Sequence, residues 1–448
     1  MTPATPDIDT AVVGAGVGGL ATAHALGRAG RGVHVFEAAD AVGGRMRTLH
    51  SDGWRIDTGA EMLPSAGYTA TWSLIRELGM AAEVSRVPGA LSLWRGGRAR
   101  PHAGRPLGLL TGGGLSPRAR LELVRLQAGS GGDVGEPADP VTLEEFAASR
   151  SPEVRERFLY PLAAGFFGWR PERSAAAPLL AHLRSTGSTA HWRTYRGGMD
   201  ALARRLAAGL QVSTGTAVHR VAAVPGGARL TLDGGTVTAR SAVLAVPAPV
   251  AARLHPGAPA DERGFLASCT FAPMLRVSLA LARRPATAGG MRGFATLIPA
   301  AEDDLLNVIT LDHNKHPDRA PDGRGLVSLI AAPPATAALM GAGDAEATAA
   351  LAERAERYLP GLRSLVRRVH VHRFPHGLPE ATPAALREHR TFRGRPARAV
   401  DYAGDWTQLR PCSEGAVASA QVTAARLLAH AAERPTSTHP VRPGRTLR

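Results

Sequence analysis

Asp9-Thr-Ala-Val-Val-Gly14-Ala-Gly16-Val-Gly-Gly19-Leu is the stretch of the chain that decides the fold. An apolar run ends at Gly14, and three glycines then lead into a helical pattern. Gly14 permits the tight turn, Gly16 lets the backbone approach a pyrophosphate, and Gly19 lets the helix pack on the strand. This strand–turn–helix pattern is typical of dinucleotide binding, with the phosphates at the positive end of the helix.

Two features just beyond this stretch extend the pattern. Val-His-Val-Phe-Glu37 is predicted to be a second strand ending in an acid, 23 residues past Gly14. Glu37 is expected to accept hydrogen bonds from ribose hydroxyls, whereas an arginine there would have indicated a 2′-phosphate. A Gly43-Gly44-Arg45 turn follows. Together these residues predict a nucleotide-binding α/β unit at the start of the chain.

Length and composition place the chain among two-domain globular proteins. It has 448 residues, of which 44% are apolar, and this length is long for a single core. No run of eighteen apolar residues occurs, so no transmembrane helix is expected. The first residues lack a basic region and a secretory apolar run. Two cysteines, Cys269 and Cys412, fit a reducing cytoplasm, and no Cys/His cluster has metal-site spacing.

The strongly basic charge does not indicate a nucleic-acid partner. The chain carries 53 basic and 38 acidic residues, a formal charge of +15. Lys315 is the only lysine, so 52 of the basic residues are arginines, and they are spread along the sequence. No helix-turn-helix, zinc-finger or aromatic–basic RNA motif occurs. We expect a cytoplasmic protein, with peripheral contact to an anionic membrane left open.

Hydrophobic periodicity predicts the remaining elements. Strands without intervening helices after Pro273 indicate a mainly antiparallel sheet. Residues 80–190 are predicted to be a helical insertion over a substrate cavity, with turn-rich pieces at 104–114 and 129–140. Within it, 101–126 alternates arginine with leucine, which fits a solvated helix, or a lip that rests on a membrane or borders the pocket entrance. Helices are expected at 70–78, 117–126, 142–148 (with a capping box), 200–210, 345–359 and 413–430, and strands at 212–224, 228–232, 241–247, 275–282, 305–311, 326–331 and 368–374.

Motifs late in the chain complete a recognisable order. Tyr195-Arg196-Gly-Gly198-Met199 leads into a helix, Val218 lies in a following strand, and Gly404-Asp405 and Glu414-Gly415-Ala416 come near the end. With the opening motifs, these residues resemble the FAD superfamily of flavin amine oxidases, protoporphyrinogen oxidases and phytoene-type desaturases, from about residue 7 to 430.

The resemblance implies an α/β fold with a discontinuous Rossmann-like FAD-binding domain. That domain would comprise 1–80, 195–265 and 390–432. An α+β substrate domain, with the antiparallel sheet and the helical insertion, would comprise 81–194 and 266–389. The Pro-, Thr- and Arg-rich tail, 433–448, is expected to be disordered.

FAD is the implied cofactor, and the resemblance assigns roles to several residues. Arg45 would lie near the pyrophosphate, Val218 would pair its backbone with the adenine edge, and Asp405 would bond ribityl or phosphate oxygens. The helix after Gly415 would direct its N-terminal N–H groups at the N1/O2 side of the flavin. The full predicted cofactor-binding set is Gly14, Gly16, Gly19, Glu37, Gly43, Gly44, Arg45, Met62, Val218, Gly404, Asp405, Glu414, Gly415 and Ala416.

The substrate region departs from the amine oxidases. Many of them place an aromatic residue where this chain has Cys412, and many hold a lysine that positions a water at flavin N5. The only lysine here, Lys315, is a poor match for that position. The 403–416 segment is more similar to desaturases, and the stretch around Lys315 to protoporphyrinogen oxidases. No catalytic residue is identified; the pocket candidates are Trp406, Cys412, Tyr195, Arg196, His313 and Lys315, with core packing, a surface turn or a solvated loop as the alternatives.

These implications predict an FAD-dependent oxidoreductase that desaturates a largely apolar biosynthetic small molecule by hydride transfer to flavin N5. Its partners would be that substrate and O₂ or another electron acceptor. One alternative is a protoporphyrinogen-type or amine oxidase using O₂. A second is a non-redox cyclase or isomerase with a structural flavin, and a third is a basic surface-binding module. The sequence does not set the substrate, the acceptor or the oligomeric state.

Overall fold

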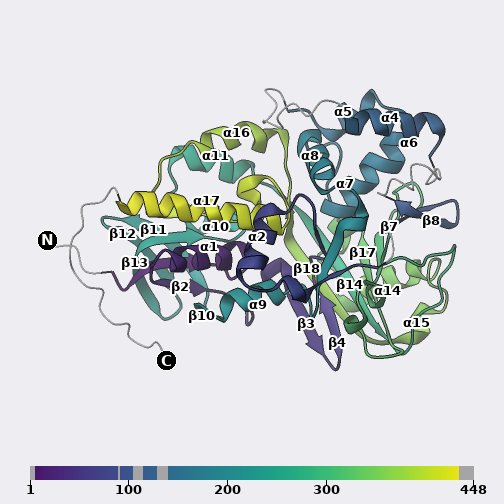
Figure 1. Cartoon of the computed structure of the whole chain (residues 1–448), viewed down its shortest axis with the longest axis horizontal. Helices are drawn as coiled ribbons and strands as arrows, with labels where there is room; N and C mark the ends of the chain where they lie inside the picture. The colour runs from purple at the N-terminus through teal and green to yellow at the C-terminus, as the bar shows by residue number, and fades with distance from the viewer. Residues whose placement is uncertain (1–5, 89–90, 104–114, 129–139, 433–448) are drawn as a thin grey trace.

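The computed structural model describes residues 6–88, 91–103, 115–128 and 140–432. Two lobes lie along the long axis of the molecule (Figure 1), one built on a largely parallel sheet and the other on an antiparallel sheet. The predicted turn-rich piece 104–114, all but the last residue of 129–140, and the tail 433–448 lie outside the described residues.

The first sheet confirms the nucleotide-binding architecture. Its order is β10-β2-β1-β13-β12-β11, with β19 also paired to β13. The parallel strands are β1 (Ile8–Val13), β2 (Val33–Phe36), β10 (Gln211–Ser213), β13 (Gly235–Leu244) and β19 (Val400–Tyr402), and β11 (Val218–Val224) and β12 (Gly227–Leu232) add an antiparallel meander. The single strand predicted at 212–224 is therefore two strands, separated where Gly215 turns with φ +63°.

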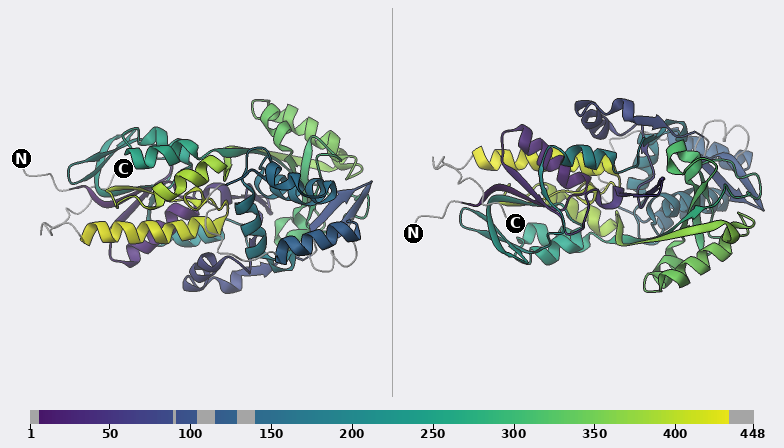
Figure 2. Two further views of the ribbon diagram at one scale, coloured as in Figure 1. Left: turned by 90° about the horizontal axis from the view of Figure 1, so that it is seen from above. Right: turned by 90° about the horizontal axis from the view of Figure 1, so that it is seen from below.

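Alternate residues of the central strands bury both faces of this sheet. Val12 and Val35 face one core, whereas Val13 and Phe36 face the other, as expected for strands covered on both sides. The first core is closed by α1 (Val17–Arg28), α9 (Ala201–Ala207) and α17 (Ser413–Ala432); the second by α10 (Ala248–Leu254), α11 (Ala260–Ser268) and α16 (Pro383–Arg393). Figure 2 shows α17 running along this lobe.

The second sheet is antiparallel except for one parallel pair, β15 with β7. Its order is β18-β14-β17-β16-β15-β7-β8. The strands are β7 (Leu91–Arg95), β8 (Arg98–Ala103), β14 (Phe271–Leu281), β15 (Ala295–Leu297), β16 (Leu306–Leu311), β17 (Gly325–Ala331) and β18 (Val366–Pro379), and the helices are α12 (Asp312–Lys315), α13 (Pro333–Leu339), α14 (Asp344–Ala355) and α15 (Leu362–Leu365). The predicted mainly antiparallel sheet is confirmed, with β7, β8 and β15 as added strands.

A helical layer lies beside this second sheet (Figure 1). It contains α4 (Pro117–Ala128), α5 (Leu143–Ala148), α6 (Pro152–Val154), a π-helical turn (Arg155–Leu159), α7 (Tyr160–Phe167) and α8 (Ala176–Thr186). The predicted capping box is present: Glu145 N donates to Thr142 Oγ1 (3.1 Å) and Thr142 N to Glu145 Oε2 (2.8 Å). Within the described ranges, no helix is both long and apolar enough to span a bilayer.

Small elements join the two lobes. β3 (Thr48–Ser51) pairs with β4 (Trp54–Asp57), and β5 (Leu63–Pro64) and β6 (Val84–Arg86) both pair with β9 (Trp192–Tyr195). The helix α2 (Thr69–Glu77) packs beside α17. The segment between β4 and α2 therefore runs from one lobe to the other, along the cavity described next.

Candidate cofactor and substrate cavity

The glycine turn between β1 and α1 has two kinds of glycine. A Cβ on Gly14 (φ +106°) would lie 2.6 Å from Ala245 O, and one on Gly19 would lie 2.0 Å from Gly14 O. Neither position can carry a side chain without moving backbone. A Cβ on Gly16 would meet nothing within 4 Å, and Gly16 lines the main cavity. The open side of Gly16 and the adjacent start of α1 fit an anionic group such as a pyrophosphate.

Glu37 and Val218 lie together behind this turn. The Glu37 carboxylate accepts from Ala15 N (2.7 Å) and Ala39 N (2.9 Å). Thr216 N donates to Glu37 O (2.8 Å), which brings the start of β11, at Val218, to the same end of the sheet. Neither Glu37 nor Val218 lines the main cavity. Their predicted contacts with ribose and adenine remain predictions.

Arg45 joins the two ends of the chain. Gly43 (φ +111°) donates its N–H to Ala15 O (2.9 Å), which holds the Gly43-Gly44 turn against the glycine turn. Arg45 then donates from Nη1 and Nη2 to the two carboxylate oxygens of Asp405, at 2.9 and 2.7 Å. Both side chains line the cavity. The bidentate pair leaves further guanidinium and carboxylate positions for polar groups of a cofactor.

The start of α17 forms the next part of the wall. Cys412, Ser413 and Ala416 line the cavity, and a Cβ on Gly415 would lie 2.1 Å from Arg410 O. Glu414 turns to the neighbouring helix instead, where its carboxylate accepts from Ala70 N (3.0 Å) and Thr71 N (2.8 Å) at the start of α2. The structure thus gives Glu414 a helix-capping position outside the cavity lining.

The cavity has a volume of about 690 Å³ and two chemically different ends. The polar end is formed by the glycine turn, Arg45, Asp405 and the start of α17. The other end is an apolar chamber between the helical layer and the antiparallel sheet. It is lined by Met62, Leu93, Phe158, Leu162, Phe166, Trp192, Met274, Leu297 and Ile330. This arrangement suits a flavin at one end and a largely apolar molecule at the other.

One wall of the chamber rests on a buried charge cluster. Glu61 lines the cavity and is paired with Lys315 Nζ (2.6 Å) and with Arg276. Behind it, Asp57 accepts from Lys315 (2.7 Å) and Arg319 (3.1 Å). Burial alone would raise the pKa of Asp57, but these two cations hold it well below its usual range.

Burial has the opposite effect on the cation: it lowers the pKa of Lys315. Asp312 lies beside Arg276 and Lys315. Asp318 lies between Arg319 and Arg55. Four carboxylates therefore face four cations, and the cluster is formally neutral.

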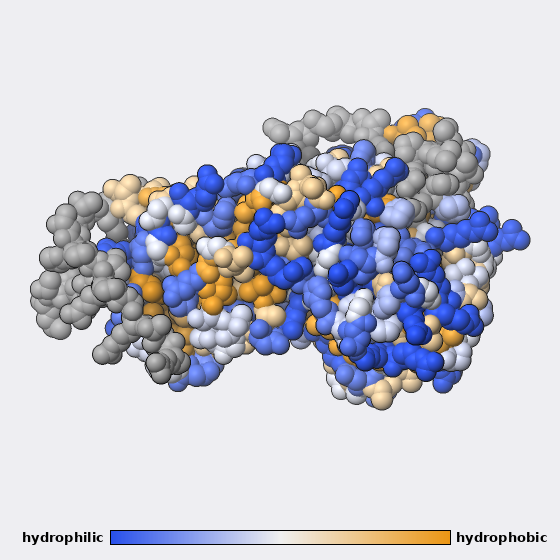
Figure 3. Space-filling view, turned by 60° about the horizontal axis from the view of Figure 1, so that its bottom comes forward, coloured by the Kyte–Doolittle hydropathy of each residue, from blue (hydrophilic) through white to orange (hydrophobic). Residues whose placement is uncertain are grey.

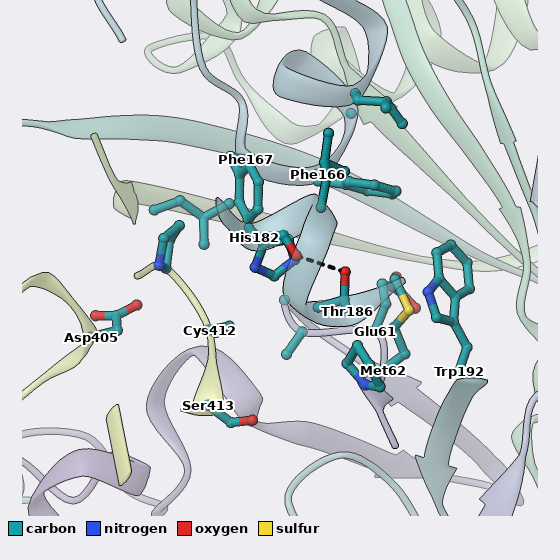
Figure 4. Close-up of a pocket in the computed structure, with 18 of the residues that line it drawn as sticks. Glu61, Met62, Phe166, Phe167, His182, Thr186, Trp192, Asp405, Cys412 and Ser413 are labelled. Atoms are coloured by element: carbon teal, nitrogen blue, oxygen red, sulfur yellow. Dashed lines mark hydrogen bonds between the residues drawn. The ribbon is translucent and has the colours of Figure 1, made fainter. Parts of the chain in front are cut away.

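His182 is a cavity residue that the sequence did not indicate. It lies on α8, packed against Phe167 (ring centroids 5.0 Å apart) and Tyr68 (6.5 Å). Its Nδ1 is buried without a hydrogen-bond partner in the described structure. Burial, together with nearby Arg410, lowers its pKa to about 4, so the imidazole is neutral at pH 7. In Figure 4, His182 lies next to Cys412, where the polar end meets the chamber.

Cys412 is the pocket candidate that the structure places in the cavity wall. Two aromatic candidates lie in the core instead. Trp406 is 1% exposed, packs with its ring 5.8 Å from Phe265, and donates Nε1–H to Val246 O (3.1 Å). Tyr195 is fully buried in the core on the α1 side of the parallel sheet. The large apolar ring area explains both positions, because burying it stabilises the fold.

The three polar candidates also lie outside the cavity lining. Arg196 is exposed and donates to Ser85 Oγ (2.8 Å). His313 is buried against the backbone of Leu326 (2.9 Å), away from the cavity lining. Lys315 reaches the cavity indirectly, through Glu61. The sequence could not separate these positions because the ion pairs that bury Lys315 join residues more than 250 positions apart.

The comparisons with known proteins agree on one family. The model for flavin-containing amine oxidoreductases matches residues 17–428. Over 52 residues, the chain is 48% identical to a phytoene desaturase of Fusarium fujikuroi and 56% identical to a hydroxyneurosporene desaturase of Cereibacter sphaeroides. Each match spans 12% of this chain, and they span 9% and 10% of those two relatives.

Solved structures share the fold over almost the whole chain. Cyclohexylamine oxidase from Brevibacterium oxydans IH-35A gives a TM-score of 0.75 at 19% identity, covering 96% of this chain and 100% of that one. A putrescine oxidase gives 0.73 at 20% identity, covering 94% and 99%. At these identities the likeness establishes the fold alone.

Proposed function

The chain belongs to the family of flavin-containing amine oxidoreductases, FAD-dependent oxidoreductases, and on this premise we propose that it dehydrogenates a largely apolar, uncharged small molecule at a C–C or C–N bond. Bound FAD supplies the hydride acceptor of this reaction, flavin N5. The glycine turn, the Arg45–Asp405 pair and the start of α17 are the parts of this chain that would hold it.

The apolar chamber is the observation that carries the proposal. Its walls are aliphatic and aromatic side chains from both the sheet and the helical layer. The charge cluster behind Glu61 is formally neutral, so this wall offers an ammonium substrate no uncompensated carboxylate. Because apolar surface gains about 25 cal/mol per Å² on leaving water, the chamber favours an uncharged hydrocarbon-like substrate over a small amine.

His182 supplies the second half of the reaction. Forming a double bond removes one hydride and one proton from adjacent atoms of the substrate. Bound flavin would take the hydride, and we assign the proton to Nδ1 of the neutral His182 imidazole. This nitrogen has no competing partner within the described structure and is unprotonated at pH 7. Its pKa of about 4 makes it a weak base, because a general base works best when its pKa lies near the working pH.

Anaerobic mixing tests the reaction directly. The purified, FAD-loaded protein is mixed without O₂ with acyclic polyenes, porphyrinogens or primary amines, and the visible flavin absorbance is followed. Bleaching by a polyene supports the proposal, whereas bleaching by amines alone would contradict the apolar substrate. Product formation without bleaching would point to a non-redox enzyme, and a protein that takes up no FAD would overturn the whole assignment.

A further inference from the structure

The outer side of α4 combines basic and apolar residues that no described ion pair covers. Arg118, Leu121, Val124 and Arg125, here called the α4 face, are all exposed, and Leu121 and Val124 retain 50% and 49% of their surface. The opposite side of the helix holds Leu123, which is 2% exposed. Positions three and four apart share one side of a helix, so α4 presents a basic–apolar stripe outward.

Exposed apolar residues concentrate in this region. The described residues include five exposed large hydrophobic side chains, and three of them, Leu121, Val124 and Val141, belong to the helical layer. Figure 3 shows apolar surface between the two grey segments at the upper right, the end of the molecule where Figure 1 places α4. A soluble surface has scattered apolar residues, whereas this group lies beside a concentration of positive charge.

A surface hollow lined by four arginines opens on the α4 face, with which it shares Arg118, Leu121 and Arg125. Arg118 and Arg125 line it from α4, Arg150 from the turn after α5, and Arg184 from α8. The structure gives none of these four an ion pair within the described residues. Glu122, the one carboxylate in the lining, is bonded to Ser151 N (3.2 Å). The hollow therefore holds an excess of positive charge suited to phosphate groups.

The same helices also line the substrate chamber. Leu123 of α4 lines the main cavity from its inward side, and Arg184 of α8 lines both the cavity and the arginine-lined hollow. A surface that receives phosphates and apolar groups side by side matches the interface of an anionic bilayer. From this juxtaposition we propose that the α4 face docks on an anionic phospholipid membrane, with lipid phosphates in the hollow and Leu121 and Val124 among the acyl chains.

Vesicle binding tests this docking without any substrate, so its failure is separate from failure of the proposed reaction. The FAD-loaded protein is sedimented with vesicles of phosphatidylcholine alone, or with about a third phosphatidylglycerol, at low and high salt. We expect binding to the anionic vesicles at low salt and its loss at high salt. Equal binding to both vesicle types, or none to either, overturns the proposal.

Two double variants separate the contributions. Arg118→Gln with Arg125→Gln should lower the partition coefficient about thirtyfold, from about fivefold for each arginine near the surface. Leu121→Asp with Val124→Asp should lower it about tenfold or more. Arg363→Gln with Arg367→Gln, and Val422→Asp, are exposed matched controls on other elements and should bind as the parent does.

Competing anions decide the source of the phosphate. If the Leu121/Val124 variant binds anionic vesicles as well as the parent does, the apolar residues do not enter the bilayer. If inorganic phosphate or an RNA displaces the protein from vesicles at a concentration equal to that of the lipid, the hollow binds anions in general. Either result excludes the bilayer as the occupant. Melting temperatures within about 2 °C of the parent show that a variant has kept its fold. A loss of vesicle binding in an α4-face variant therefore supports docking only when that variant passes this check.

Discussion

At the scale of single residues, the glycines of the turn serve either backbone packing or access to the cofactor, and substitutions can separate these two roles. Gly16 has ordinary backbone angles (φ −71°) and open space at its Cβ position. We predict that Gly16→Val folds with a loss below about 1 kcal/mol yet binds FAD about tenfold or more weakly, measured by flavin fluorescence. Gly19→Ala, in contrast, should lose about 3 kcal/mol of unfolding free energy because its Cβ meets backbone. Equal FAD affinity in Gly16→Val would exclude a cofactor at this turn.

The Arg45–Asp405 pair is the second residue-scale test. Each partner is buried or partly buried, and two hydrogen bonds join them. A double-mutant cycle with Arg45→Met and Asp405→Asn should give a coupling of about 1–2 kcal/mol in unfolding free energy without FAD. Additive single effects would mean that the pair contributes nothing to stability and that each side chain serves the cofactor alone.

His182 is tested by the pH dependence of flavin reduction. Replacement by Gln removes the base but keeps a polar side chain of similar size. We expect flavin reduction by substrate to slow about 100-fold or more and to lose any dependence on the protonation of this residue. A separate readout is the NMR titration of His182 in the parent, which should remain neutral down to about pH 4. Titration near its ordinary value would contradict the assignment.

At the scale of elements, Glu414 couples the starts of two helices. It belongs to the first turn of α17 yet accepts hydrogen bonds from the backbone of α2. Glu414→Ala would leave buried N–H groups without a partner, and we predict a loss of about 2 kcal/mol in urea unfolding. Glu145→Ala, in the exposed capping box of α5, is the matched control and should cost about 1 kcal/mol or less. Equal losses would mean that Glu414 caps α2 no more strongly than an exposed acid does.

Most of the elements, but not their pairing, could be predicted from the sequence. Periodicity and glycine turns predicted α1, α2, α14 and α17 and most long strands, because these depend on local burial patterns. The split between β10 and β11 was missed because Gly215 lies within an otherwise strand-like run. The position of β7 in the antiparallel sheet depends on its pairing with β15, more than 200 positions away, which no local pattern encodes. β8 follows β7 as its antiparallel neighbour.

The candidate site divides in the same way. Gly16, Arg45 and Asp405 lie in motifs whose spacing predicts a cofactor, and the structure brings all three to the cavity. His182 lies in an ordinary amphipathic helix, so its isolation in the cavity follows from tertiary packing alone. Trp406 and Tyr195 lie in the core and not in the cavity wall. A large ring next to a motif can be buried in the core or face the cavity, and the sequence does not distinguish the two.

At the scale of the whole molecule, buried histidines should make the fold sensitive to acid. Burial lowers the pKa of His182 to about 4 and of His372 to about 3. Both lie below the value of about 6.5 expected in the unfolded chain, so the unfolded state binds protons first as the pH falls. The unfolding free energy should therefore drop below about pH 6.5, by about 2 kcal/mol for each residue at pH 5.

Urea titrations at about pH 7 and about pH 5 measure this difference. The double variant His182→Gln and His372→Gln should lose less stability on acidification than the parent does. Identical acid sensitivity in the double variant and the parent would show that other groups control it.

The ion pair between Arg45 and Asp405 can form only late in the synthesis of the chain. Its partners are 360 positions apart, so a ribosome working at about 5–20 residues per second needs about 20–70 s between making one and making the other. During that interval the glycine turn exists without the wall that completes the cavity. Cofactor capture at this wall must therefore wait for the nascent chain to extend past α17.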